Sequence, residues 1–117
     1  MSFTNDFVWG VASSAYQIEG GIAEDGRGAS VWDTFSHTPG KTYEGHTGDI
    51  ACDSFHRFEE DLAALVQLGV KHYRFGISWT RIFPDGRTLN EQGFAYYDKV
   101  VDLLIEHGIT PWITLFH

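Results

Sequence analysis

A stretch of nine residues occurs twice in similar form, and this repeat restricts the chain to a small set of folds. Residues 65–73, LVQLGVKHY, are matched by residues 104–112, LIEHGITPW, so that 39 positions separate Gly69 from Gly108. In each copy an amphipathic stretch ends at the glycine, and an apolar, aromatic run follows it. Glycine can adopt the left-handed conformation that ends a helix. Each copy is therefore predicted to form a helix, a tight turn and a strand.

The apolar spacing predicts two surface helices, each with one buried face. The first runs from about Asp53 to Leu68 and is expected to bury Phe55, Phe58, Leu62, Leu65 and Val66. The second runs from the N-cap residue Asn90 to His107 and is expected to bury Phe94, Tyr97, Val101, Leu104 and Ile105. Strands are predicted from Phe7 to Ala12, Tyr73 to Trp79 and Trp112 to His117. The order βαβαβ favours parallel pairing with right-handed crossovers.

This order predicts the α/β class and, within it, a (β/α)8 TIM barrel. A closed barrel of that kind takes roughly 250 residues. We therefore interpret residues 1–117 as the N-terminal fragment of a single barrel domain, supplying about three strands and two helices and ending at His117. The alternative is an open doubly wound sheet, which usually has a glycine-rich phosphate-binding turn directly after the first strand. Here a long irregular loop follows Gly10 instead.

Charge and composition exclude several classes of partner. The net charge is −8 with eight Lys and Arg, whereas nucleic acids and anionic membranes attract concentrated positive charge. The sequence has no apolar run near the roughly twenty residues of a membrane span, and its start lacks the pattern of a signal peptide. The lone Cys52 is compatible with a reducing compartment. We expect a cytoplasmic protein that binds neither nucleic acid nor membranes.

The segment between Gln17 and Cys52 is too long for an ordinary connection between a strand and a helix. Loops of this length in compact domains are usually functional. In a parallel barrel a loop that follows a strand lies at the face where active sites form. Residues 30–35, SVWDTF, are predicted to form a short helical turn within it. The other interpretation is that the loop only covers the rim of the barrel.

Arg74 is a charged residue within a predicted strand, and its side chain must face one side of the sheet. Side chains alternate along a strand, so Arg74 shares a face with Gly76 and Ser78, opposite Tyr73 and Phe75. Helices should cover the aromatic face, so Arg74 is expected to point into the barrel and to need an acidic partner from outside this chain. If the 39-residue offset is a structural repeat, Ile113 corresponds to Arg74, and His117 corresponds to Ser78 and faces the interior.

Motifs along the whole chain resemble those of family 1 glycoside hydrolases, the retaining β-glucosidases and their relatives. The matching blocks are residues 7–12 (FVWGVA), 15–20 (AYQIEG), 25–28 (DGRG), 32–35 (WDTF), 48–53 (GDIACD), 73–75 (YRF), 78–79 (SW), 81–84 (RIFP) and 114–117 (TLFH). They occur in the family's order. The resemblance covers about the first quarter of a typical member, and the family's barrel agrees with the prediction from the repeat.

The resemblance implies roles for three residues. Gln17 and His117 match positions that hydrogen-bond the sugar on the non-reducing side of the cleaved bond, and both side chains can donate and accept. Arg74 matches the arginine that holds the nucleophilic carboxylate, and Glu19 matches a position expected to hold the loop. The two catalytic glutamates of the family follow its fourth and seventh strands. No catalytic residue is therefore expected in this chain, which should be inactive alone.

The hypothesis is thus a fragment of a β-glycosidase of β-glucosidase type, acting in carbohydrate metabolism and needing neither a cofactor nor a metal. Its partners would be a β-glucoside or related saccharide and the remainder of the barrel, or further copies of the chain that associate through open sheet edges. A relative that prefers 6-phospho-β-glycosides is an alternative within the same class. An inactive carbohydrate-binding or scaffolding fragment is the alternative from another class.

Overall fold

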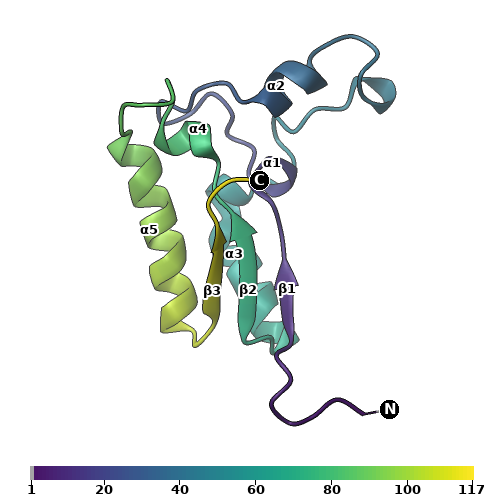
Figure 1. Ribbon diagram of the computed structural model, residues 1–117, viewed down its shortest axis with the longest axis vertical. Coiled ribbons are helices and arrows are strands. Elements are labelled where there is room, and N and C mark those ends of the chain that lie inside the picture. The colour runs from purple at the N-terminus through teal and green to yellow at the C-terminus, as the bar shows by residue number, and fades with distance from the viewer. Residues whose placement is uncertain (1) are drawn as a thin grey trace.

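A computed structural model describes residues 2–117 and contains one parallel sheet with helices packed against one of its faces (Figure 1). The strands β1 (Gly10–Ala12), β2 (His72–Gly76) and β3 (Thr110–Thr114) lie in the order β1-β2-β3, and both pairings are parallel. The long helices α3 (Ser54–Leu68) and α5 (Glu91–Glu106) precede β2 and β3. The predicted βαβαβ order and parallel pairing are confirmed.

Both long helices begin and end within one residue of the predicted bounds. Gly69 follows α3 with φ of 70°, and Gly108 follows α5 with φ of 68°, so both glycines adopt the left-handed conformation expected of them. Asn90 is the N-cap residue of α5, as predicted. The core lies between the helices and the sheet and consists of Phe58, Leu62, Leu65, Tyr73, Phe75, Ile82, Tyr97, Val100, Leu104 and Ile109.

Three residues predicted to be buried are exposed. Val66 is 48% exposed, Phe94 51% and Ile105 59%. The core contacts only the sides of the helices that carry residues such as Leu62 and Leu104, and these three side chains lie outside it. Helical spacing predicted the apolar side of each helix, but fewer residues on that side are buried than expected.

The strands are shorter than predicted, and three short helical segments within residues 2–117 were missed. They are α1 (Ala15–Ile18), the 3₁₀ helix η1 (Tyr43–Gly45) and α4 (Trp79–Ile82). Only Gly10, Val11 and Ala12 pair with β2, so β1 begins three residues after Phe7. β2 ends at Gly76, and Trp79 begins α4 instead of continuing the strand. β3 ends at Thr114, so His117 lies beyond the strand.

The register of the sheet differs by one residue from the offset between the two glycines. Arg74 pairs with Trp112, and Phe75 pairs with Ile113, so Ile113 does not share the face of Arg74. The reason lies in the turns, because β2 begins three residues after Gly69 whereas β3 begins two residues after Gly108. The predicted equivalence of Ile113 and Arg74 is therefore wrong.

The two faces of β2 differ as predicted, but Arg74 is not buried. Tyr73 and Phe75 are 5% and 4% exposed beneath the helices, whereas Arg74 lies on the opposite face and is exposed. Neither α3 nor α5 covers this open face. Among residues 2–117 no carboxylate forms an ion pair with Arg74. Residues 2–117 form three strands and not the closed barrel in which Arg74 was expected to be buried.

Candidate functional site

A cavity of about 290 Å³ lies at the carboxyl edge of the sheet. Its walls come from the segment after β1, which includes α1 (Ala15–Ile18) and α2 (Val31–Ser36), and from residues at and just beyond the ends of β2 and β3. Figure 1 shows α1 and α2 beyond the carboxyl ends of the strands. The long loop therefore lies where the sequence predicted it. Its lining includes Tyr16, Glu19, Val31, Trp32, Trp79, Phe116 and His117.

The structure brings only one of the three predicted site residues to this cavity. His117 lines it, three residues after the end of β3. Gln17 lies on α1 beside the lining residue Tyr16, but it is exposed, and its Oε1 accepts a hydrogen bond from Ser14 Oγ at 2.6 Å. Arg74 lies on the open face, two residues before Gly76, which does line the cavity.

A buried cluster of charged and polar side chains lies next to the cavity, and Glu19 belongs to both. Glu19 is 5% exposed and Arg81 is fully buried, and Arg81 Nε donates to Glu19 Oε2 at 3.3 Å. The Tyr97 hydroxyl donates to the other carboxylate oxygen and accepts from the backbone N of Ser78 at 2.7 Å. These contacts join α1, α4 and α5, and Glu19 holds the loop as the sequence predicted.

Arg81 has two further kinds of contact that offset part of the cost of its burial, and its buried Nη1 has no hydrogen-bond partner within residues 2–117. Its Nη2 donates to the carbonyls of Gly20 and Gly21 at 3.2 and 3.4 Å. Its guanidinium carbon lies 4.0 Å from the centroid of the Phe55 ring, a cation–π distance. A buried arginine requires such a dense set of partners, because a buried charge without them is strongly destabilising.

Burial dominates the protonation of this cluster. It raises the pKa of Glu19, and the charge of Arg81 and the hydrogen bond from Tyr97 oppose that rise. Burial and the neighbouring Glu19 raise the pKa of Tyr97, so that its hydroxyl keeps its proton and remains a donor. Glu19 therefore accepts from two donors, Arg81 Nε and the Tyr97 hydroxyl.

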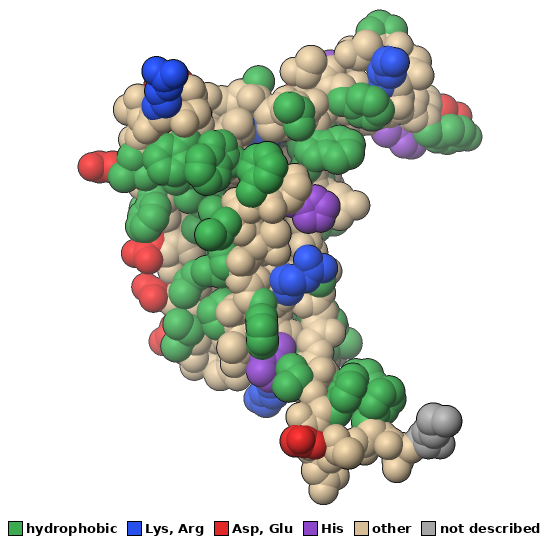
Figure 2. Space-filling model, viewed as in Figure 1, with side chains coloured by type: hydrophobic (Ala, Val, Ile, Leu, Met, Phe, Trp, Pro, Cys, Tyr) green, Lys and Arg blue, Asp and Glu red, His purple; other side chains and the backbone are tan. Residues whose placement is uncertain are grey.

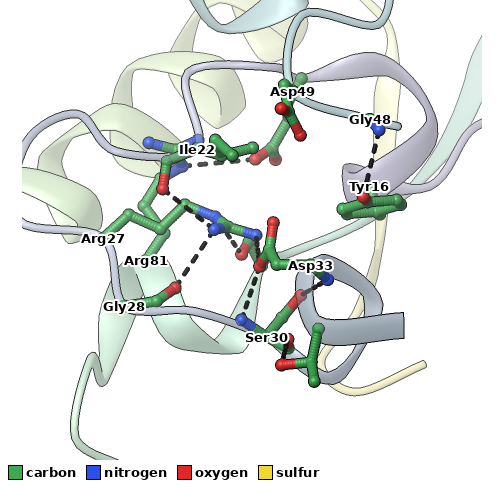
Figure 3. Close-up of polar contacts among 12 residues, drawn as sticks. Tyr16, Ile22, Arg27, Gly28, Ser30, Asp33, Gly48, Asp49 and Arg81 are labelled. Atoms are coloured by element: carbon green, nitrogen blue, oxygen red, sulfur yellow. Dashed lines mark hydrogen bonds and ion pairs between the residues drawn. The ribbon is translucent and has the colours of Figure 1, made fainter. Parts of the chain in front are cut away.

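A second cluster, of polar contacts around Arg27 and Asp33, holds α2 beside the cavity (Figure 3). Arg27 Nη2 donates to Asp33 Oδ2 at 2.9 Å, and both side chains are almost fully buried. Arg27 also donates to the carbonyls of Ile22 and Gly28 at 3.1 Å each, and its Nε donates to Ser78 Oγ at 3.3 Å. The short helix is thus tied to the segment that precedes it and to the end of β2.

Asp33 also caps the helix to which it belongs. Ser30 and Asp33 form a capping box, in which Ser30 N donates to Asp33 Oδ2 at 2.6 Å and Asp33 N donates to Ser30 Oγ at 3.3 Å. Burial raises the pKa of Asp33, but the hydrogen bonds from Ser30 and Arg27 outweigh it and hold that pKa below its usual value. The predicted helical turn at residues 30–35 is confirmed.

Arg27, Arg81 and Tyr97 are structural residues of the site that the sequence analysis did not identify. Arg27 and Arg81 lie within two of the blocks that resemble the family, and this was the available signal. Strand alternation could not reveal them, because one lies in a loop and the other on a four-residue helix. Within residues 2–117, His, Cys, Asp and Glu side chains form no group of three or more that could hold a metal ion.

The parallel strands, the helices on one face and the cavity at the carboxyl edge define the class as part of a (β/α)8 barrel. The comparisons then give the family. Residues 1–117 match the model of glycosyl hydrolase family 1 over their whole length, and the chain belongs to this family. No helix within residues 2–117 has the length and apolarity needed to cross a membrane.

The named relatives are glucosidases that are about four times longer than this chain. The chain is 55% identical to beta-glucosidase A of Acetivibrio thermocellus, over 100% of the chain and 26% of that relative. It is 53% identical to the aryl-phospho-beta-D-glucosidase BglC of Bacillus subtilis, over 99% of the chain and 24% of that relative. A solved beta-glucosidase from Thermotoga maritima in complex with deoxynojirimycin matches with a TM-score of 0.95 and 51% identity, over 98% of the chain and 26% of the solved chain.

Proposed function

We propose that the chain functions as part of a retaining β-glycosidase of β-glucosidase type. The observation that carries this proposal is the family match along residues 1–117, together with 55% identity to a β-glucosidase over the full chain. In the proposed enzyme the chain is the N-terminal portion of a single catalytic barrel. The remaining strands come from further polypeptide, and the cytoplasm is the proposed compartment.

The proposed site combines residues of this chain with two carboxyl groups supplied by the rest of the barrel. Gln17 and His117 hydrogen-bond the hydroxyls of the sugar, and Arg74 holds the nucleophilic carboxylate in its ionised form. Retaining glycosidases use two carboxyl groups about 5 to 5.5 Å apart, one as the acid and base and one as the nucleophile. Because the chain supplies neither, the 117 residues alone are proposed to be inactive.

The sugar could carry a phosphate or lack one. The two named relatives hydrolyse different classes by name, a β-glucosidase and an aryl-phospho-β-D-glucosidase, at 55% and 53% identity. This small difference does not favour either class. A 6-phospho-β-glycoside is therefore the second candidate substrate.

The test is a chimaera, called here the reconstituted barrel. It joins residues 1–117 to the part of the Thermotoga maritima β-glucosidase that follows the matched segment. We expect the purified chimaera to hydrolyse 4-nitrophenyl β-D-glucoside, while residues 1–117 alone do not. A phosphorylated glucoside assayed in parallel tests the second candidate.

The parent Thermotoga enzyme is the control for substrate and conditions. A chimaera with the circular dichroism and thermal transition of a folded barrel but no turnover would contradict the proposal. It would favour the alternative in which this chain is a carbohydrate-binding or scaffolding fragment.

A further inference from the structure

The helix α2 is inverted, with its polar residues inside and its apolar residues outside. Asp33 and Ser36 are buried, whereas Val31 is 79% and Trp32 48% exposed. A surface helix normally buries its apolar side. The apolar side of α2 is therefore uncovered among residues 2–117 and is available for contact.

Polar contacts on its inner side hold α2 in place. A helix of six residues has little stability of its own, so it depends on contacts outside its backbone. The Arg27–Asp33 ion pair and the Ser30 capping box supply contacts at its start. The Tyr16 hydroxyl hydrogen-bonds Ser36 Oγ at 2.6 Å near its end. The exposed Val31 and Trp32 are thus presented by an anchored helix.

Trp32 forms one aromatic wall of the cavity. Its ring lies 6.1 Å from the Tyr16 ring at an interplanar angle of 24°, a stacked arrangement, and Phe35 supports it edge-on at 5.9 Å. A second aromatic pair, Trp79 and Phe116, lines another part of the cavity at 6.4 Å. Figure 2 shows hydrophobic side chains gathered on the surface around α2 and along the upper edge of the sheet.

The part of the cavity wall formed by α2 offers an apolar surface with few free hydrogen-bonding groups. Sugar hydroxyls need hydrogen-bond donors and acceptors, and burying them without partners is costly. The hydroxyl oxygen of Ser30 already accepts from Asp33 N, and its neighbours Val31 and Trp32 offer an apolar surface. Stacked aromatic rings contribute about 0.5 to 1.5 kcal/mol beyond the burial of their area.

We propose that Trp32, supported by Tyr16 and flanked by Val31, binds an aromatic leaving group of the substrate. This inference rests on the proposed function, because it adds a specificity contact to the same site. Gln17 and His117 would bind the sugar, and the α2 wall would bind the aryl ring attached to it. Trp32 is then a residue that selects aryl glycosides over glycosides with small aliphatic leaving groups.

The test measures the substrate preference of the reconstituted barrel and its Trp32→Ala variant. We expect Trp32→Ala to lower kcat/KM for 4-nitrophenyl β-D-glucoside about tenfold relative to methyl β-D-glucoside, which corresponds to about 1.4 kcal/mol of lost transition-state stabilisation. The ratio of kcat/KM for the two glucosides is compared between the variant and the unsubstituted reconstituted barrel. The different reactivity of the two leaving groups therefore cancels. Trp32→Phe, which keeps an aromatic face, should restore most of the preference.

Two controls separate this role from a structural one. Deoxynojirimycin resembles the sugar without a leaving group, so its inhibition constant should not change in Trp32→Ala. Tyr43→Ala removes an aromatic ring that is 77% exposed and away from the cavity, and it should leave the preference unchanged. Equal losses for both glucosides, or weaker deoxynojirimycin binding, would overturn the inference while leaving the proposed function intact. An unsubstituted reconstituted barrel that is folded but inactive would overturn both the inference and the proposed function.

Discussion

At the scale of single residues, the site depends on the buried pair of Glu19, which lines the cavity, and Arg81. Glu19 and Arg81 each have a partner that is also buried, and their contacts reach α1, α4 and α5. A buried ion pair adds little net stability compared with apolar residues, but breaking one is costly because the remaining charge has no partner. The pair therefore fixes which conformation the loop adopts.

Glu19→Gln should destabilise the reconstituted barrel by about 3 to 5 kcal/mol, because Arg81 would stay buried without a countercharge. Urea unfolding followed by circular dichroism measures the change. The matched control is Glu59→Gln, which removes a carboxylate that accepts from Lys99 at 2.8 Å on the exposed surface. Exposed pairs contribute only about 0.2 to 1 kcal/mol. Equal effects of the two substitutions would contradict the structural role of Glu19.

At the scale of elements, the helix α5 crosses α4 at a glycine. A Cβ atom added at Gly93 would lie 2.0 Å from the carbonyl oxygen of Arg81, which is backbone and cannot move aside easily. The same carbonyl accepts from Asn90 Nδ2 at 2.9 Å, so the start of α5 is tied to α4 at this point. Close approach of two helices, and not helix propensity, explains a glycine in the third position of α5.

Gly93→Ala decides between propensity and packing. Alanine favours a helix interior by about 1 kcal/mol, whereas overpacking costs about 1 to 3 kcal/mol and more when backbone must shift. We expect the clash to dominate, so that the thermal transition of the reconstituted barrel falls. Gln92→Ala, at an exposed neighbouring position, should change stability by less than about 0.5 kcal/mol. An unchanged or higher transition in Gly93→Ala would show that the helices are not packed this closely.

The elements also show what the sequence could predict. Both long helices were predicted to within a residue, because their apolar spacing and terminal glycines are local signals. The end of β2 and the helix α4 were missed, since the aromatic run through Trp79 continues the strand pattern past Gly76. The Glu19–Arg81 pair joins residues 62 positions apart, and its cluster requires a fold that periodicity alone does not place.

At the scale of the whole molecule, the sheet has one covered face and one open face. The open face carries Arg74, which is exposed, and Trp112, whose Nε1 donates to His72 Nδ1 at 3.1 Å. Family membership was predicted from motifs, and the comparisons confirm it. The roles of Gln17, His117 and Arg74 stay predictions. Gln17 and His117 would bind a sugar, and Arg74 would hold a carboxylate from outside residues 2–117.

The most direct measurement is a crystal structure of the reconstituted barrel bound to deoxynojirimycin. We predict that the Arg74 guanidinium lies inside the closed barrel within about 2.7 to 3.2 Å of a glutamate carboxylate from the joined portion. Gln17 and His117 should lie at similar distances from hydroxyls of the inhibitor. An Arg74 side chain outside the barrel, or one inside it with no carboxylate beside it, would contradict the account.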